Sequence, residues 1–458
     1  MRKREKHLSH GLSFTALALC VALMGPEPAT HSSIRYATLP LGSSIILATP
    51  ENTAGLFRED DPSVRTALRL QQRLRSKGLP ATLQNAVAAI RERQRLLRQS
   101  IAVSFLIDSV TAATWEASPQ HHPLWIAMTA DGTGIRVGLN RDQIEAALTE
   151  ERIGSVPRPQ NVRITGLHDG TLVNRILSDG VARPGYRINQ ELTKSMLIAA
   201  LLENRMESRT EIEVPLVFTP GRLENPTSIP LGDLTLLASG HSNFKGSPWG
   251  RVANVRKALR DHVNNVVVAP GEVFSFNAAL GDTLAKEGRW EQAKVINNGV
   301  LTMEQGGGIC QVSTTLFRGV LHAGFPVLER KSHSMYVSYY EVGGVGLDAT
   351  VYKGDPDLTF LNDTGNPIVL QAYDDGDDAY VHIYGTPDGR VATLDGPYFA
   401  QTAPADFSDG GRALNRNEIG WRHRVVYADG SVKSDAVIST YKSLPKSIVY
   451  KYTALSAL

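Results

Sequence analysis

The sequence has little cysteine: its 458 residues contain two, Cys20 and Cys310. No CxxC or HxxxH pair occurs, and these are spacings typical of zinc sites. The formal net charge is only +2, so the chain lacks the strongly basic field that nucleic-acid binding needs. Internal repeats and low-complexity tracts are also absent. The composition therefore predicts an ordinary globular protein with no metal, no cofactor and no nucleic-acid partner.

The amino-terminal apolar run, residues 12–24, is shorter than the ~20 residues that a membrane span requires. It follows a basic start at residues 2–6 and precedes a stretch of small or polar residues. This order predicts a secretory signal over residues 1–30 and export to the periplasm or cell envelope. An uncleaved signal that anchors the protein in the membrane is the alternative.

Cleavage of the signal would remove Cys20 and leave Cys310 as the only cysteine of the mature chain. Cys310 then has no partner for an internal disulfide bond. A single thiol in an exported protein is buried and inert, paired with another molecule, or reactive. The residues around Cys310 bear on this choice.

Three glycines, residues 306–308, precede Cys310 and allow a close approach of the backbone. Apolar residues then recur at helical spacing until Gly324 and Pro326 end the pattern. They are Ile309, Val312, Leu316, Phe317, Val320 and Leu321. This pattern predicts a buried helix with Cys310 in its first turn, where the helix dipole favours a thiolate and could receive an oxyanion.

Two segments that follow the predicted helix carry a base and a carboxylate. Residues 327–340 alternate and are rich in Val, Tyr and Ser, which predicts a strand that bears His333. Residues 347–352 predict a second strand that bears Asp348. Cys310, His333 and Asp348 together are the nucleophile, base and orienting group of a thiol acyl-transfer site.

Other readings of the same residues remain open. Gln305 or Gln311 could donate to the oxyanion, or either could be a structural amide. Cys310 and His333 could bind zinc with His241 or His382. The hydroxyl groups of residues 313–315 could supply a nucleophile or form the polar face of the helix.

The length of the chain allows two to four domains, and the pattern of elements predicts a multidomain α+β protein. Asn140 and Asn189 stand where the N-caps of two short helices are expected, and Asp429-Gly430 predicts a β-hairpin. The predicted divisions are a helical region at 31–106, a small α+β domain at 107–220, a linker at 221–233, a core domain at 234–386 and a β-hairpin extension at 387–458.

Several motifs of the core domain resemble the VanW family, which is named for an accessory protein of bacterial glycopeptide-resistance clusters. The motifs are PGEVFSFNAALGDT, GGGICQVSTTLFRGVLHAGF, SHSMYVSYY and LDATVY, in this order within residues 234–386. The preceding domain is similar in place and pattern to the peptidoglycan-binding domain that often precedes VanW domains. The resemblance implies a protein of the bacterial envelope, without giving a reaction.

A more distant resemblance concerns mechanism. GICQVSTTLFRGVLHAGFPV, then His333, then GLDAT are similar in order and spacing to the core of transglutaminase-like and papain-like thiol enzymes. This resemblance implies a nucleophile at Cys310, a base at His333 and an orienting group at Asp348. The expected function is a thiol-dependent acyltransferase or peptidase that acts on peptidoglycan stem peptides. The alternatives are a non-catalytic peptidoglycan-binding module and an envelope scaffold for a protein partner.

Overall fold

The computed structural model describes residues 44–46, 61–203, 209–281, 290–297, 300–407 and 412–455. The predicted signal at residues 1–30, and the membrane anchor that is its alternative, lie outside these residues. Within the described part of the chain, no helix is both long and apolar enough to cross a membrane. The described residues form a mixed α+β structure.

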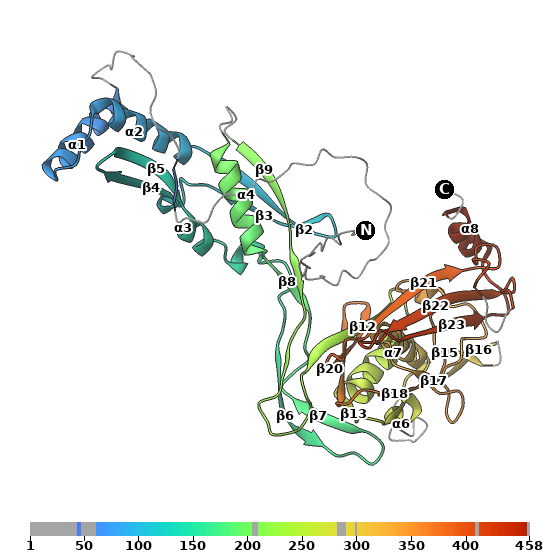
Figure 1. Cartoon of the computed structure of the whole chain (residues 1–458). Coiled ribbons are helices and arrows are strands. Elements are labelled where there is room, and N and C mark those ends of the chain that lie inside the picture. Colours follow the sequence, from blue (N-terminus) through green and yellow to red (C-terminus); the bar gives the residue numbers. More distant parts are fainter. Residues whose placement is uncertain are drawn as a thin grey trace, which may run out of the picture.

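The structure consists of two lobes joined by a narrow waist (Figure 1). Within the described residues, the first lobe contains four α-helices and two three-stranded sheets, with strand orders β1-β5-β4 and β3-β2-β9. Its helices are α1 (Pro62–Ser76), α2 (Leu83–Leu97), α3 (Arg141–Ala146) and α4 (Gln190–Leu202). Its strands are β1 (Ser44–Ile46), β2 (Ser100–Ile107), β3 (Val110–Ala117), β4 (Ile126–Asp131), β5 (Gly134–Asn140) and β9 (Arg209–Pro215).

The predicted N-caps of two helices in this lobe are confirmed. The side chain of Asn140 accepts a hydrogen bond from the backbone of Gln143, and that of Asn189 accepts one from Leu192. The prediction of helix up to residue 106 was wrong, because residues 100–107 form β2. Alternate residues of β2 are buried, so the two-residue period of a strand overrides the helical pattern before it.

Three segments of the chain cross the waist side by side. Gln160 and Arg183 form a β-bridge, and β8 (Gly185–Arg187) pairs with β10 (Val217–Thr219). Gly185 and Gly221 lie where a Cβ atom would overlap with the backbone of a neighbouring segment. The waist is therefore narrow because glycine lets these three backbones approach closely.

The second lobe contains a seven-stranded sheet with the order β11-β6-β7-β13-β19-β20-β12. Its strands are β6 (Val162–His168), β7 (Asn174–Ser178), β11 (Leu223–Glu224), β12 (Thr235–Asn243), β13 (Val266–Val268), β19 (Ile368–Asp375) and β20 (Asp378–Gly385). Two of them, β6 and β7, come from the predicted domain at 107–220. One hydrogen-bonded sheet thus continues across the predicted linker at 221–233.

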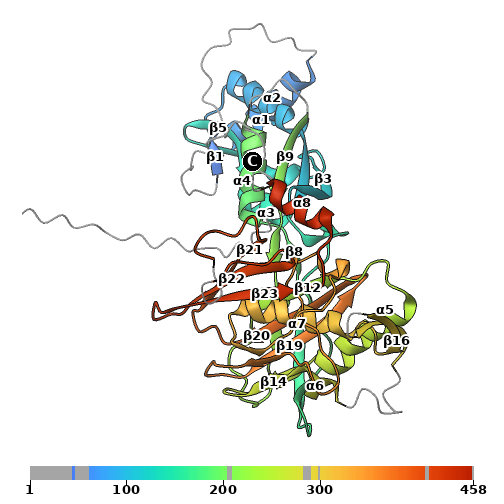
Figure 2. The same ribbon diagram turned by 90° about the vertical axis from the view of Figure 1, so that its right-hand side faces the viewer.

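Helix α7 (Ile309–Ala323) lies between this sheet and the C-terminal sheet, which consists of β21 (Val391–Tyr398), β22 (Glu418–Val426) and β23 (Val432–Thr440) (Figure 2). A Cβ atom at Gly240 on β12 would overlap with the carbonyl group of Thr315. The helix can therefore pack this closely on the strand only because the residue at position 240 is glycine. On the other face, the Nε2 atom of His423 lies 2.8 Å from the carbonyl oxygen of Leu321. The helix that carries Cys310 is therefore held on both sides.

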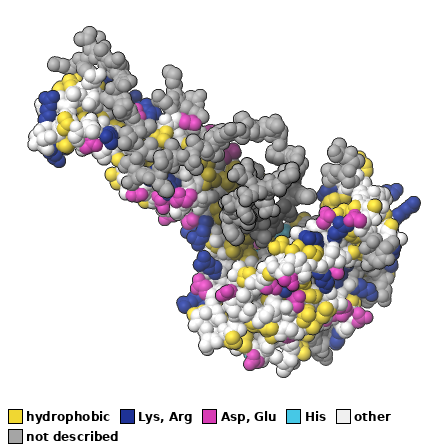
Figure 3. Space-filling view, in the orientation of Figure 1, with side chains coloured by type: hydrophobic (Ala, Val, Ile, Leu, Met, Phe, Trp, Pro, Cys, Tyr) yellow, Lys and Arg dark blue, Asp and Glu magenta, His cyan; other side chains and the backbone are white. Residues whose placement is uncertain are grey.

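Smaller elements complete the second lobe. They are α5 (Trp249–Lys257), the π-helix η3 (Ala258–Val263), α6 (Phe276–Leu280), the 3-10 helix η4 (Ser338–Tyr340) and α8 (Lys446–Leu455). The remaining strands are β14 (Val273–Ser275), β15 (Gln292–Asn297), β16 (Val300–Gln305), β17 (Val327–Glu329) and β18 (Thr359–Leu361). On the face shown in Figure 3, basic and acidic side chains are interspersed over both lobes.

The strands predicted at 327–340 and 347–352 were wrong in extent. Within 327–340, only Val327–Glu329 forms a strand. Within 347–352, Thr350 forms an isolated β-bridge with Lys331, and the other residues form no strand. His333 and Asp348 therefore lie on irregular segments. The hairpin predicted around Asp429-Gly430 is confirmed as β22 and β23, and β21 extends it to a three-stranded sheet.

Candidate active site

The three glycines before Cys310 shape the start of α7. Gly306 and Gly308 have φ angles of 82° and 111°, which L side chains rarely adopt, and a Cβ atom at Gly307 would overlap with Ala293. The helix then begins at Ile309, and Cys310 lies in its first turn as predicted. Cys310 is the second residue of the helix, so its N–H group is among the first four, which have no acceptor one turn earlier within the helix.

The sulfur of Cys310 is half-buried and forms no disulfide bond. Its Sγ atom lies 3.4 Å from the carbonyl oxygen of Val351 and 3.7 Å from the hydroxyl oxygen of Thr350. A protonated thiol can donate to the carbonyl, and the Thr350 hydroxyl can donate to a thiolate. The thiol is thus placed beside polar groups and is not sealed in aliphatic packing.

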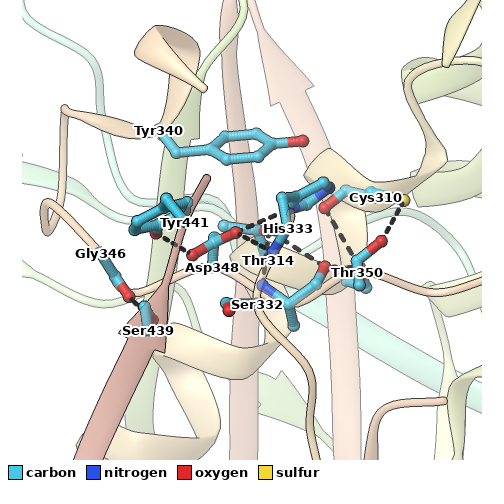
Figure 4. Close-up of polar contacts among 12 residues, drawn as sticks. Cys310, Thr314, Ser332, His333, Tyr340, Gly346, Asp348, Thr350, Ser439 and Tyr441 are labelled. Atoms are coloured by element: carbon cyan, nitrogen blue, oxygen red, sulfur yellow. Dashed lines mark hydrogen bonds and ion pairs between the residues drawn. The ribbon is translucent and has the colours of Figure 1, made fainter. Parts of the chain in front are cut away.

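His333 and Asp348 form a buried pair next to the thiol (Figure 4). The Nδ1 atom of His333 lies 2.5 Å from Oδ2 of Asp348, and the same oxygen accepts the backbone N–H of His333 at 2.9 Å. The carboxylate therefore holds the Nδ1 side of the ring. The imidazole lies between Asp348 and Cys310, which leaves Nε2 for the sulfur.

Burial and hydrogen bonding act in opposite directions on the charges of these three groups. Burial lowers the pKa of His333, but its hydrogen bonds to Asp348 and Cys310 outweigh burial and raise this pKa to about 9. Burial raises the pKa of Cys310, but the hydrogen bond and positive charge of His333 bring it below the usual value. The pKa of Asp348 is also lowered, because the effect of His333 and Arg330 exceeds that of burial. Each of the three shifts therefore favours the charged form of its group, which is the thiolate, the imidazolium or the carboxylate.

Three further residues surround this pair, and none of them was predicted from the sequence. The hydroxyl group of Tyr441 donates to Oδ1 of Asp348 at 2.5 Å. The Nη2 atom of Arg330 lies 3.5 Å from the same oxygen, and its Nε donates to the backbone carbonyl of Asp348 at 2.6 Å. The ring of Tyr340 lies over the imidazole, with 5.3 Å between the ring centroids. No local motif marks these residues, because only the fold brings them to His333.

Comparison with known proteins identifies the family. Residues 250–384 match the model described as "VanW like protein". The chain is 40% identical over 220 residues to "Uncharacterized protein YoaR" of Bacillus subtilis (strain 168), a match that covers 47% of this chain and 69% of that protein. The chain belongs to the VanW family. It is also 35% identical over 121 residues to "Vancomycin B-type resistance protein VanW" of Enterococcus faecalis (strain ATCC 700802 / V583), covering 25% of this chain and 42% of that protein. No solved structure matches the chain.

The part of the chain that matches the VanW model contains the thiol, the imidazole and the carboxylate, as well as Arg330 and Tyr340. Tyr441 lies beyond the end of that match, on the C-terminal side of β23. The polar site of this VanW protein is therefore assembled from the family domain and from a segment that follows it.

The two glutamines that were predicted as oxyanion donors do not lie together at the thiol. Gln311 is fully buried: its Oε1 accepts a hydrogen bond from Arg251 at 2.7 Å, and its Nε2 donates to Ser242 at 3.1 Å. Its amide is thus a structural group of the core. Gln305 is exposed at the end of β16, opposite Gln292.

The hydroxyl groups on α7 also have structural partners. Ser313 and Thr314 donate to the carbonyl oxygen of Ala349 at 2.7 and 3.3 Å, and Thr315 donates to Gln311. Ser313 and Thr314 thus fix the segment that carries Asp348 to the helix, and Thr315 lies against Ser242 of β12. Since all three hydroxyl groups have partners, the polar stripe of α7 is accounted for without a hydroxyl nucleophile.

The histidines that were considered for a zinc site with Cys310 point to other partners. The Nε2 atom of His241 lies 2.7 Å from Asp378, and His382 lies between Ser239 and Tyr373. Within the described ranges, no group of three or more His, Cys, Asp or Glu side chains has a geometry suited to a metal ion.

The carbonyl groups of the loop between His333 and Asp348 have no neighbouring strand to pair with, and Arg318 of α7 donates hydrogen bonds to several of them. It is 1% exposed and donates to five backbone carbonyl groups over distances of 2.5–3.0 Å. These groups belong to His241, Tyr340, Val342, Gly344 and Leu347. Burial lowers the pKa of Arg318 to about 10. The loop between His333 and Asp348 is irregular because one guanidinium group satisfies its carbonyls.

We expect Arg318→Lys to destabilise the protein and to disorder the site. Lysine keeps the charge but offers three donors in place of five, so buried carbonyl groups lose their partners at about 1–3 kcal/mol each. Denaturant unfolding should show a loss of about 3 kcal/mol or more. The exposed Arg416→Lys is the matched control and should unfold like the wild type. A stable Arg318→Lys variant would contradict this role for the guanidinium group.

Proposed function

We propose that this VanW protein is a cysteine-dependent acyl-transfer enzyme of the bacterial envelope, with Cys310 as nucleophile. The observation that supports the proposal is a half-buried thiol that lies beside a buried imidazole, which a carboxylate holds from the other side. A structural cysteine needs no such partners, whereas a nucleophilic thiol needs a base and a group that orients it.

In the proposed reaction the Cys310 thiolate attacks the carbonyl carbon of an amide and forms a C–S bond. The carbonyl oxygen takes up the electron pair, and the N–H group of Cys310 in the first turn of α7 donates to it. The C–N bond then breaks, and Nε2 of His333 gives its proton to the leaving amine. Water or a second amine next attacks the thioester, loses a proton to His333 and releases the thiolate.

Asp348 keeps its charge throughout these steps. Its Oδ2 atom accepts from Nδ1 of His333, so that Nε2 is the nitrogen that exchanges a proton with the substrate. On the far side, Tyr441 donates to the carboxylate and Arg330 forms an ion pair with it, and both stabilise the charge in a buried place. Gln311 takes no part in the proposed reaction.

The substrate class that we propose is the stem peptide of peptidoglycan. It is the amide-rich polymer of the compartment to which the predicted signal directs the chain, and the Enterococcus relative is named a vancomycin B-type resistance protein. We propose an exported protein in the periplasm or cell envelope. The alternative is a non-catalytic module that binds peptidoglycan through the same residues, and a failed reaction would favour it.

Turnover of purified peptidoglycan fragments tests the proposal. The protein should release amines from stem peptides, or join them to an added amine, with products that mass spectrometry identifies. We expect Cys310→Ala to reduce turnover by at least about a thousandfold, because the covalent route is lost. Cys20→Ser is the matched control, since it removes the other thiol of the chain. Equal turnover by Cys310→Ala would refute the proposed nucleophile.

A further inference from the structure

The residue that follows the last strand of the C-terminal sheet reaches the candidate active site from outside the family domain. Tyr441 follows β23 directly, and its hydroxyl group lies 2.5 Å from Oδ1 of Asp348. The side chain is 3% exposed, so water does not compete for this hydrogen bond. Figure 4 shows Tyr441 and His333 on opposite sides of the Asp348 carboxylate.

Backbone and side-chain hydrogen bonds fix Tyr441 in this place. Its N–H group donates to the carbonyl of Asn417 at 3.1 Å, and the Asn417 amide donates back to its carbonyl at 2.6 Å. The ring packs edge-on against Tyr336, with 5.6 Å between centroids. The N–H group, the carbonyl group and the ring of Tyr441 are all held, so its hydroxyl group stays at the Asp348 carboxylate.

The edge of β23 is joined to the segment that carries His333. The backbone N–H group of Lys442 donates to Ser334 at 2.8 Å, and Nη1 of Arg330 donates to Ile438 at 3.0 Å. Arg330 thus contacts the C-terminal sheet with one nitrogen and Asp348 with another. The sheet and the site share one hydrogen-bond network.

We propose that the C-terminal sheet contributes to the active site by placing Tyr441, and that Tyr441 positions Asp348 against His333. This inference rests on the proposed function, because it gives Asp348 the task of orienting the base. It assigns a role to residues 387–458, which the VanW match does not include.

The two oxygens of Asp348 explain why one hydroxyl group matters. Oδ2 accepts both hydrogen bonds from His333, whereas Oδ1 has the Tyr441 hydroxyl at 2.5 Å and Arg330 at the longer distance of 3.5 Å. Without the hydroxyl, the carboxylate can turn toward Arg330 and weaken its hold on the imidazole. His333 then becomes a weaker base, and the thiol beside it ionises at higher pH.

The titratable and charged groups that face Asp348 and His333 come from three parts of the fold. They are Cys310 and Arg318 on α7, Arg330, Tyr336 and Tyr340 on the segment after β17, and Tyr441 after β23. Burial raises the pKa of each of the three tyrosines, so all of them stay neutral near pH 7. Replacing the Tyr441 hydroxyl by hydrogen therefore changes no charge directly.

The pH dependence of thiol alkylation tests this role without any substrate. Iodoacetamide reacts with the thiolate, so the pH at half-maximal rate reports the ionisation of Cys310 in the full chain with Cys20→Ser. We expect Tyr441→Phe, which keeps the ring, to raise this midpoint by about 0.5–1 pH unit. Tyr398→Phe is the matched control, because Tyr398 lies on β21 of the same sheet and its hydroxyl group bonds to Asp395 instead; its midpoint should stay at the wild-type value.

The outcomes separate this inference from the proposed function. A folded Tyr441→Phe variant with an unchanged midpoint would overturn the positioning role, even if the wild type is an enzyme. A wild-type midpoint near 8.5, the value of a free thiol, would instead remove the basis of the proposed function. If Tyr441→Phe fails to fold, Ser439→Ala replaces it: the Ser439 hydroxyl donates to Gly346 at 2.5 Å, near Asp348, and this variant should raise the midpoint in the same direction. An unchanged midpoint there would count against a role for the sheet.

Discussion

His333→Ala is expected to slow the alkylation of Cys310 at pH 6 by roughly 10- to 100-fold. The hydrogen bond and positive charge of His333 are what lower the pKa of the thiol against the opposing effect of burial. Without the imidazolium, only the contacts with Val351 and Thr350 oppose the effect of burial, so the pKa of the thiol should rise. The thiolate fraction at pH 6 then falls by one to two orders of magnitude.

The rate of iodoacetamide labelling measured from pH 5 to 10 gives this comparison. The wild-type and His333→Ala curves should separate at low pH and approach each other at high pH, where both thiols ionise. His322→Ala is the matched control, because His322 lies in the last turn of the same helix, far from the sulfur. If His333→Ala and His322→Ala have the same profile as the wild type, Cys310 is not paired with an imidazolium.

Asp348→Asn is expected to reduce acyl transfer by roughly a hundredfold or more while leaving the thiol in place. The carboxylate accepts the Nδ1 proton of His333, and an amide of the same size can present its NH₂ group there instead. An NH₂ group that donates to Nδ1 favours the imidazole tautomer with its proton on Nε2. Nε2 is the nitrogen that must accept a proton in the second half of the proposed reaction. The variant also removes the hydrogen bond that raises the pKa of His333 to about 9, so this pKa should fall toward its ordinary value.

The pH dependence of acyl transfer shows in which direction the pKa of His333 changes in Asp348→Asn. In the wild type, His333 is protonated below a pKa of about 9, so transfer of its proton to a leaving amine should decline as the pH rises through 9. In Asp348→Asn this decline should begin at lower pH. Asp378→Asn is the matched control, because Asp378 also holds a histidine, His241, at 2.7 Å but lies on β20 of the seven-stranded sheet. Equal losses in both variants would point to a general loss of stability.

The helix of the site could be predicted from sequence because its signals are local. Glycines at 306–308 allow the backbone to turn into the helix, a regular apolar spacing continues it, and Gly324 ends it with a φ angle of 74°. The N-caps at Asn140 and Asn189 and the turn at Asp429-Gly430 are equally local, and the structure has all of them. A side chain that bonds to its own neighbours leaves a pattern that can be read along the chain.

The surroundings of the thiol could not be predicted, because distant residues make them. The alternation at 327–340 is that of a strand, but Arg318 bonds to the carbonyl groups of the following loop and takes the place of a neighbouring strand. Tyr441 meets Asp348 only because the C-terminal sheet folds back over α7. Gln311 has the same local context as a catalytic amide, yet its partner Arg251 binds it within the core.

Capture of an acyl group on Cys310 tests the central claim most directly. The protein is mixed with a peptidoglycan stem peptide, quenched in acid and digested, and the mass of the peptide that contains Cys310 is measured. The account predicts an added acyl group on this cysteine that neutral hydroxylamine releases, as a thioester requires, and none on Cys310→Ser under the same conditions. An unmodified Cys310 in protein that turns over the peptide, or an adduct that survives hydroxylamine, would contradict a thiol acyl-transfer site.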